Sequence, residues 1–149
     1  MVDPLITAKK VASLRARVLR AREKLPESAD HFVRDRDRQE LVAFSFMIAC
    51  QEALDLAAHA LSDAGREVPA TARAHFKALA DQGQVDDHLA RALANCLGAG
   101  NLLAHAYAEV DPARLYQELP GGLAALEQFA TLAAGWAEAG LTENEAQDA

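Results

Sequence analysis

The sequence has little of what a β-sheet or a disulfide-stabilised domain is built from. Aromatic residues make up 5% of the 149 residues, isoleucine and threonine are scarce, and there are only two cysteines, Cys50 and Cys96. Alanine and leucine dominate instead, and both favour helices. The cysteines lack the spacing of metal ligands and lie in apolar helical contexts, so we expect reduced core residues rather than a disulfide. The composition therefore predicts an all-α protein.

Long uninterrupted apolar runs are also missing. Lys9, Lys10 and Arg15 interrupt the N-terminal segment, which argues against a signal peptide. No stretch reaches the roughly 20 apolar residues that a membrane span needs. The length suits one domain. We therefore expect a single-domain cytoplasmic protein with no membrane association.

The charge is unevenly distributed along the chain. The net charge is -7, but residues 1–38 carry 10 Lys/Arg against 6 Asp/Glu, a net of +4, and the remaining residues carry 5 against 16, a net of -11. A basic N-terminal helix beside an acidic body could contact RNA or an acidic partner. From charge alone, a solvated helix face is the favoured interpretation.

Helix start and stop signals divide the chain into about five helices. N-cap residues and prolines mark the starts, and glycines or a proline mark the ends. The expected helices run from Asp3 to Pro26, from near Asp30 to Ala64, from Pro69 and Thr71 to Gly83, from Asp86 into the stretch 98–111, and from Asp111 through Trp136. Short connections predict an antiparallel bundle.

The last helix and the middle of the second helix have unusual features. "LPGG" at 119–122 predicts a kink or a split near Pro120. Residues 1–140 should form a single helical domain, and the polar residues 141–149 should form a disordered acidic tail.

The middle of the second helix, "LVAFSFMIACQEALDLAAHAL", is apolar on more than one face, so other helices must cover it, together with a second subunit if one is present.

The stretch "GAGNLLAHAYAEVD", residues 98–111, departs from plain helix packing. Asn101 and His105 are four residues apart and share a helix face, and Tyr107 follows as the chain leaves the helix. A histidine can give or take a proton near neutral pH, and an asparagine can bind a phosphate oxygen, so the set suits phosphodiester chemistry. It also suits a C-terminal helix cap, with Tyr107 packing beneath His105. From the residues alone, the structural interpretation is favoured.

Two glycines, Gly98 and Gly100, precede this cluster. Each glycine inside a helix costs about 1 kcal/mol relative to alanine, so both need a reason. Three reasons remain open: another backbone approaches, the helix is locally irregular, or side chains have been lost.

The order of these features resembles the HepT-like group of HEPN-domain proteins. The resemblance extends over nearly the whole chain, from the alanine-rich second helix ending in "AAHAL", through "HFKALADQG", to "NLLAHAYAEVDPARLYQEL". Members of this family are small helical bundles that form homodimers, and the well-studied ones are toxins that cut RNA without a metal. A nucleotidyltransferase antitoxin silences them by transferring AMP from ATP onto a tyrosine. The resemblance implies the same partners here, with no bound metal or cofactor.

The family motif reads Arg-Asn, three residues, His, any residue, Tyr. Its asparagine, histidine and tyrosine match Asn101, His105 and Tyr107. The resemblance implies that Asn101 and His105 are catalytic and that Tyr107 accepts AMP. The motif arginine falls on Gly100, which removes the fixed positive charge for the scissile phosphate.

Other residues offer weaker candidates for a role at this site. Arg34, Arg36 and Arg38 could supply the missing charge across a dimer cleft, although "VRDRDR" alternates charges as a solvated turn does. The remaining histidines and the second tyrosine have structural interpretations: His59 partly buried, His31, His75 and His88 at the surface, and Tyr116 in packing.

Three functions follow from these observations. The first is a ribonuclease toxin regulated by a nucleotidyltransferase antitoxin. The second is a noncatalytic dimeric partner or nucleotide-binding subunit of a small nucleotidyltransferase, which the loss of the arginine at Gly100 would explain. The third is a helical bundle without a site, which predicts that His105 and Tyr107 are buried and packed against each other.

Overall fold

The computed structural model describes residues 3–149. They form six α-helices and one short 3-10 helix, with no strand in this described part of the chain. The elements are α1 (Pro4–Lys24), α2 (Ala29–Arg34), α3 (Arg36–Asp63), α4 (Ala72–Asp81), α5 (Asp87–Ala106), η1 (Tyr107–Glu109) and α6 (Pro112–Asp148). The all-α prediction is confirmed.

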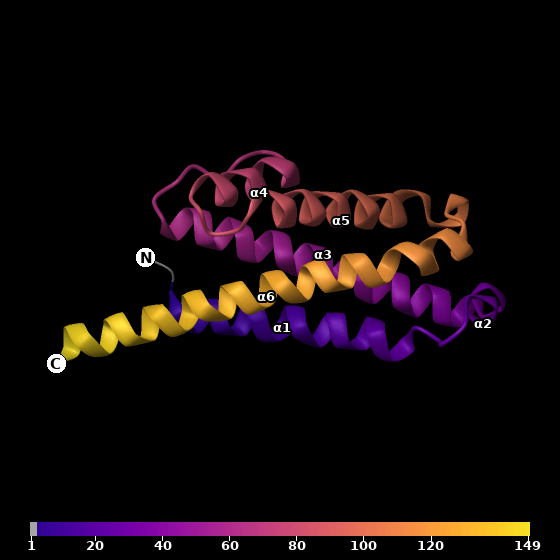
Figure 1. The fold of residues 1–149 in the computed structure, drawn as a ribbon, viewed down its shortest axis with the longest axis horizontal. Helices are drawn as coiled ribbons and strands as arrows, with labels where there is room; N and C mark the ends of the chain where they lie inside the picture. Colours follow the sequence, from indigo (N-terminus) through magenta and orange to yellow (C-terminus); the bar gives the residue numbers. More distant parts are fainter. Residues whose placement is uncertain (1–2) are drawn as a thin grey trace.

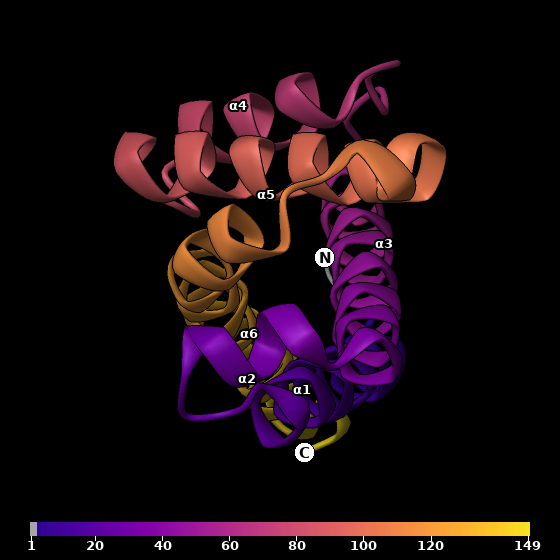
Figure 2. The same ribbon diagram turned by 90° about the vertical axis from the view of Figure 1, so that its right-hand side faces the viewer.

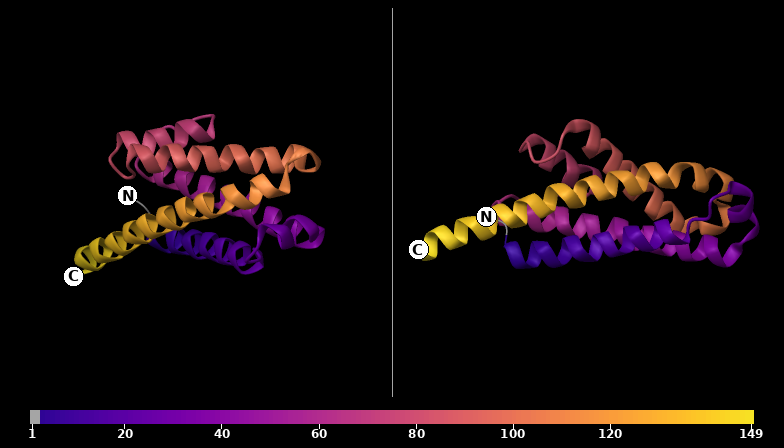
Figure 3. Two further views of the ribbon diagram at one scale, coloured as in Figure 1. Left: turned by 45° about the vertical axis from the view of Figure 1, so that its right-hand side comes forward. Right: turned by 60° about the horizontal axis from the view of Figure 1, so that its bottom comes forward.

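The long helices α1, α3 and α6 lie side by side and form the body of the bundle (Figure 1). Helices α4 and α5 pack together on one side of this body, opposite α1 (Figure 2). Helix α2 lies at the end of the bundle where α6 begins (Figure 3). The end of α5, the start of α3 and the start of α6 therefore lie close to one another.

The predicted helix starts are confirmed by their capping hydrogen bonds. Asp3, Thr71, Asp86 and Asp111 each accept a hydrogen bond from a backbone N–H in the first turn of the helix that follows. These bonds satisfy donors that have no partner within the helix. Gly65 and Gly83, which follow α3 and α4, have φ values of 72° and 75° that suit glycine.

The single helix expected from Asp30 to Ala64 is wrong, because the chain turns at Asp35. The carboxylate of Asp35 accepts a hydrogen bond from the backbone N–H of Arg38 and caps α3. Nε2 of Gln39 donates to the carbonyl oxygens of Phe32 at 2.7 Å and Val33 at 2.9 Å, which satisfies the end of α2. We call residues 34–39 the α2–α3 corner.

Of the kink or split expected at "LPGG", the split does not occur, because α6 runs as one helix through Pro120. Pro120 is exposed, and Gly122, the second glycine after it, lets α6 approach its neighbours. A Cβ atom at Gly122 would lie 3.2 Å from Sγ of Cys96 and 3.2 Å from Cε2 of Phe46. A larger residue here would push α6 away from α3 and α5.

Residues 141–149 were expected to be disordered, but α6 continues to Asp148. This segment contains alanine, glutamate and glutamine, which favour helix, and no proline or glycine that would end one. The hydroxyl of Thr142 donates to the carbonyl oxygen of Glu138 within the same helix. A polar composition therefore did not prevent helix formation.

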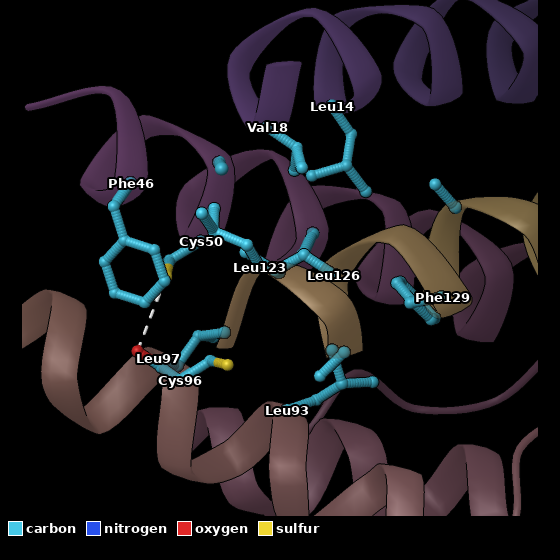
Figure 4. Close-up of a cluster of buried hydrophobic side chains, with 14 of the residues drawn as sticks. Leu14, Val18, Phe46, Cys50, Leu93, Cys96, Leu97, Leu123, Leu126 and Phe129 are labelled. Carbon is cyan, nitrogen blue, oxygen red and sulfur yellow. Dashed lines mark hydrogen bonds between the residues drawn. The ribbon is translucent and has the colours of Figure 1, made fainter. Parts of the chain in front are cut away.

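The core fills the space between α1, α3, α5 and α6 (Figure 4). Leu14, Leu93, Leu126 and Phe129 are buried there. By length and composition α3 could cross a membrane, but half of its most apolar stretch is buried inside the bundle, as expected of a core helix. Its apolar residues therefore serve the packing of the domain.

Both cysteines are free and buried, as predicted. Sγ of Cys50 donates to the carbonyl oxygen of Cys96 at 3.4 Å (Figure 4). Burial raises the pKa of both thiols, that of Cys96 to about 11. Both therefore stay protonated at neutral pH and behave as small apolar core residues.

The structural interpretations of the other polar residues mostly hold. The hydroxyl of Tyr116 donates to the carbonyl oxygen of Pro26 at 2.8 Å, which confirms its packing role. His59 lies 3.1 Å from Asp63 and is partly buried, as expected. The surface position expected for His75 is wrong, because its ring is buried with Nδ1 2.6 Å from the carbonyl oxygen of Thr71.

Candidate functional site

Helix α5 presents Asn101 and His105 to solvent on one face. Buried residues such as Cys96 and Leu103 anchor the opposite face in the core. Asn101 and His105 are both exposed, and the helix continues to Ala106, so the four-residue spacing keeps the two side chains on the same side. His105 is therefore not buried, although the interpretation as a bundle without a site predicted that it would be.

Tyr107 leaves this face as the chain changes direction. Ala106 has φ -142° and ψ 36°, which ends the regular helix, and η1 begins at Tyr107. The tyrosine is half-buried, and its hydroxyl oxygen is shielded from solvent without a hydrogen-bond partner among residues 3–149. Burial, and then the carboxylate of Glu40, raise the pKa of Tyr107, while the cation of Arg36 acts in the opposite direction. Tyr107 therefore lies beside the first turns of α3.

A pocket of about 450 Å³ lies between the α2–α3 corner, η1 and the start of α6. Tyr107 and the arginines Arg34 and Arg36 form part of its wall. We call this the Tyr107 pocket, and its lining residues are Val33, Arg34, Arg36, Gln39, Tyr107, Ala108, Val110, Pro112 and Leu115.

Two arginines from the sequence "VRDRDR" thus line the same pocket as the tyrosine within one chain, rather than only across a dimer cleft. Nε of Arg34 donates to the carbonyl oxygen of Asp30, and Nε of Arg36 lies 3.3 Å from a carboxylate oxygen of Glu40. Arg38 turns away instead, and donates to the carbonyl oxygen of Lys24. In the sequence, this pair is visible as two arginines on either side of the capping residue Asp35.

Position 100, where the family motif has arginine, is a close contact between α5 and α3. Gly100 is buried, and a Cβ atom there would lie 3.2 Å from both Cβ and Sγ of Cys50. Gly98 is exposed, and a Cβ atom there would meet nothing within 4 Å. The close approach of another helix therefore explains Gly100 but not Gly98.

A smaller groove of about 220 Å³ runs between α3 and α5 beside this contact. Asn101 lies at its edge, and most of its wall is apolar: Met47, Ile48, Cys50, Gln51, Leu54, Ala72, Leu97, Gly100, Asn101 and Ala104. Asn101 and Tyr107 therefore border different hollows.

Within residues 3–149 no group of three His, Cys, Asp or Glu side chains is placed to hold a metal ion.

The contrast between the two glycines predicts opposite effects of the same substitution. Gly98→Ala should raise the free energy of unfolding by about 1 kcal/mol, because alanine favours helix and its methyl group meets no other atom. Gly100→Ala should lower it by about 1 kcal/mol, because crowding against Cys50 outweighs the gain in propensity. Urea unfolding of the two variants measures both values. Equal stabilisation by both substitutions would contradict the close contact at Gly100.

The comparisons with known proteins agree with this fold. The family model described as Ribonuclease HepT-like matches residues 14–132. A tri-AMPylated Shewanella oneidensis HEPN toxin in complex with MNT antitoxin is similar in structure, with a TM-score of 0.79 and 22% identity over 89% of this chain and 97% of that chain. A toxin–antitoxin complex with AMP-PNP gives a TM-score of 0.78 and 21% identity over 85% and 96%.

A mutant of the MntA–HpeT toxin–antitoxin complex gives a TM-score of 0.77 and 20% identity, over 85% of this chain and 96% of that chain. No curated protein matches the sequence. At these sequence identities the solved structures show that the fold is shared. The family model, by contrast, matches most of the chain in sequence.

Proposed function

Because the chain belongs to the ribonuclease HepT-like family, we propose that it is an RNA-cleaving toxin that a nucleotidyltransferase antitoxin silences by transferring AMP onto Tyr107. One observation carries the proposal: Asn101 and His105 are exposed on one face of α5, and Tyr107 follows at the end of that helix beside two arginines. The complexes of similar fold contain MNT antitoxins, which supports this class of partner.

The exposed pair offers a proton acceptor and a hydrogen-bond donor for metal-independent cleavage of RNA. His105 removes the proton from a ribose 2′-hydroxyl, whose oxygen then attacks the adjacent phosphorus. A new phosphorus–oxygen bond forms and the bond to the 5′-oxygen breaks, and that oxygen leaves with the proton that His105 took from the 2′-hydroxyl. The products are a cyclic phosphate and a free 5′-hydroxyl. The side-chain amide of Asn101 donates to a phosphate oxygen as its charge grows.

Transfer of AMP requires Tyr107 to turn outward. Its oxygen attacks the α-phosphorus of ATP, a bond from phosphorus to the tyrosine oxygen forms, and pyrophosphate leaves. Because burial and Glu40 raise the pKa of this phenol, a base on the transferase must take its proton. The hydroxyl has no hydrogen-bond partner within residues 3–149, so none breaks when the ring moves. The resulting phosphodiester would repel an RNA phosphate near His105 and so silence the site.

We further propose that the protein acts as a homodimer in the cytoplasm. Phe44 on α3 is 53% exposed and Leu102 on α5 is 55% exposed, and we place both side chains in the proposed interface. Leu102 directly follows Asn101, so a dimer formed here would border the candidate site. Sedimentation at the mass of one chain would contradict the dimer.

A second candidate function is a noncatalytic partner of the transferase, and the packing of Gly100 favours it. A Cβ atom there would lie 3.2 Å from Cβ and Sγ of Cys50, so an arginine at this position would require Cys50 to give way by a few tenths of an ångström. The site then lacks the positive charge that the family motif places at this position. A positive charge for the scissile phosphate would then have to come from another residue.

The test that separates the two functions is RNA cleavage by the purified unmodified protein in the presence of EDTA. The first function predicts cleavage that the chelator leaves unchanged. If the protein accepts AMP on Tyr107 but leaves RNA intact under all conditions, the second function holds. Gly100→Arg is a poor test of a lost charge unless the stability of the variant is measured as well, because the substitution also disturbs the contact with Cys50.

A further inference from the structure

The lining of the Tyr107 pocket includes both charged and apolar residues. Arg34 is the last residue of α2, and Arg36 is the first residue of α3. Val33, Val110 and Leu115 contribute apolar surface. Its volume of about 450 Å³ lies within the range of roughly 300–1,000 Å³ typical of small-molecule sites. The pocket therefore suits a ligand with an anionic group and an apolar ring system.

The backbone that carries the two arginines is held in place by hydrogen bonds. Asp35 caps α3, and the side chain of Gln39 ties the last carbonyl groups of α2 to α3. The pair of Arg36 with Glu40 is highly exposed on both sides, with 81% and 54% of the side chains accessible. Exposed pairs of this kind contribute at most about 1 kcal/mol, so an arriving phosphate can displace Glu40 from Arg36.

Tyr107 has an oxygen that is shielded but unpartnered in the same wall. A phosphate attached to that oxygen needs free space beside it and a compensating positive charge. Because the oxygen is shielded in the unmodified protein, the ring has to turn before a phosphate on it can enter the pocket; the pocket then offers the space, and Arg34 and Arg36 offer the charge. Arg34 forms no ion pair with a carboxylate anywhere in the described chain, so its charge is available to a ligand.

We propose that the Tyr107 pocket binds the nucleoside monophosphate that Tyr107 carries, with the phosphate between Arg34 and Arg36 and the nucleoside against Val33, Val110 and Leu115. This inference rests on the proposed AMP transfer to Tyr107. It gives the α2–α3 corner a role in the modified state: the corner holds the AMP group in place and protects the new phosphodiester from hydrolysis.

The first experiment uses free AMP and the unmodified protein, and needs no transferase. AMP should bind saturably in an NMR titration, and the double variant Arg34→Gln, Arg36→Gln should weaken binding by about tenfold or more, since two charge-assisted hydrogen bonds are lost. Arg114→Gln is the matched control, because Arg114 is an exposed arginine in the wall of a different pocket. Adenosine should bind the wild type and the double variant alike. Equal affinity of AMP for all variants would overturn the inference.

The second experiment uses protein that carries AMP on Tyr107. A phosphodiesterase should release AMP from the double variant about tenfold faster than from the wild type or Arg114→Gln, because the phosphate is no longer held. Equal release rates from a protein modified on Tyr107 would overturn the inference and leave the proposed function intact. If Tyr107 is never modified, the proposed function fails, and the titration with free AMP alone decides whether the pocket binds a nucleotide.

Discussion

His105→Ala should reduce the rate of RNA cleavage by about 100- to 10,000-fold, the usual contribution of a positioned acid or base. His105 is the exposed histidine on the face of α5 that carries Asn101, so removing it removes the group that takes the 2′-hydroxyl proton. The change should leave stability nearly unaltered, because exposed side chains outside the core contribute little. Cleavage of a labelled RNA with purified protein in EDTA measures the rate.

His88→Ala provides the matched control for this experiment. His88 is also exposed on α5, but it lies 17 residues earlier, about 25 Å along the helix axis, so its loss should not change the rate. Asn101→Ala should lower the rate less than His105→Ala, by about 100-fold or more, because it removes one donor to the phosphate. Cleavage that survives His105→Ala unchanged would come from another site or from a contaminating nuclease.

Tyr107→Phe should abolish the gain of AMP when the protein is produced together with its transferase. The chain has two tyrosines, so Tyr116→Phe is the natural control and should gain AMP as the wild type does. Intact mass spectrometry distinguishes these outcomes directly. A full gain of AMP by Tyr107→Phe would place the modification on another side chain and would remove the basis of the proposed regulation.

The two tyrosine variants should also differ in stability. Tyr116→Phe removes a hydrogen bond to the carbonyl oxygen of Pro26 and should lower the free energy of unfolding by about 1 kcal/mol. Tyr107→Phe removes a shielded hydroxyl that has no partner within residues 3–149, so it should be neutral or slightly stabilising. Loss of AMP transfer in Tyr107→Phe therefore cannot be attributed to unfolding.

The parts of the fold that depend on local signals could be predicted from the sequence. N-caps such as Asp86 and Asp111 act on the turn that follows them, so their positions alone place the helix starts. The split at Asp35 depends on Gln39 reaching back to the carbonyl of Phe32, a contact that exists only once the chain has turned. The continuity of α6 through Pro120 depends on packing against α3 and α5, which local propensity does not describe.

The candidate site likewise has a part that local spacing predicts and a part that depends on contacts between distant segments. Asn101 and His105 lie on one helix, so their spacing was enough to place them on one face. The pocket at Tyr107 joins the α2–α3 corner to η1 and α6, and no spacing along the chain indicates that meeting. For Gly100 the sequence left three explanations open, and the 3.2 Å approach to Cys50 favours one of them.

The central claim is that AMP on Tyr107 switches off an RNA-cleaving site at Asn101 and His105. Its most direct test is RNA cleavage by one preparation in three states: without AMP, with AMP on Tyr107, and after enzymatic removal of the AMP. We predict cleavage in the first state, none in the second, and recovery in the third. Equal cleavage in all three states, or no cleavage by the protein without AMP, would contradict the account.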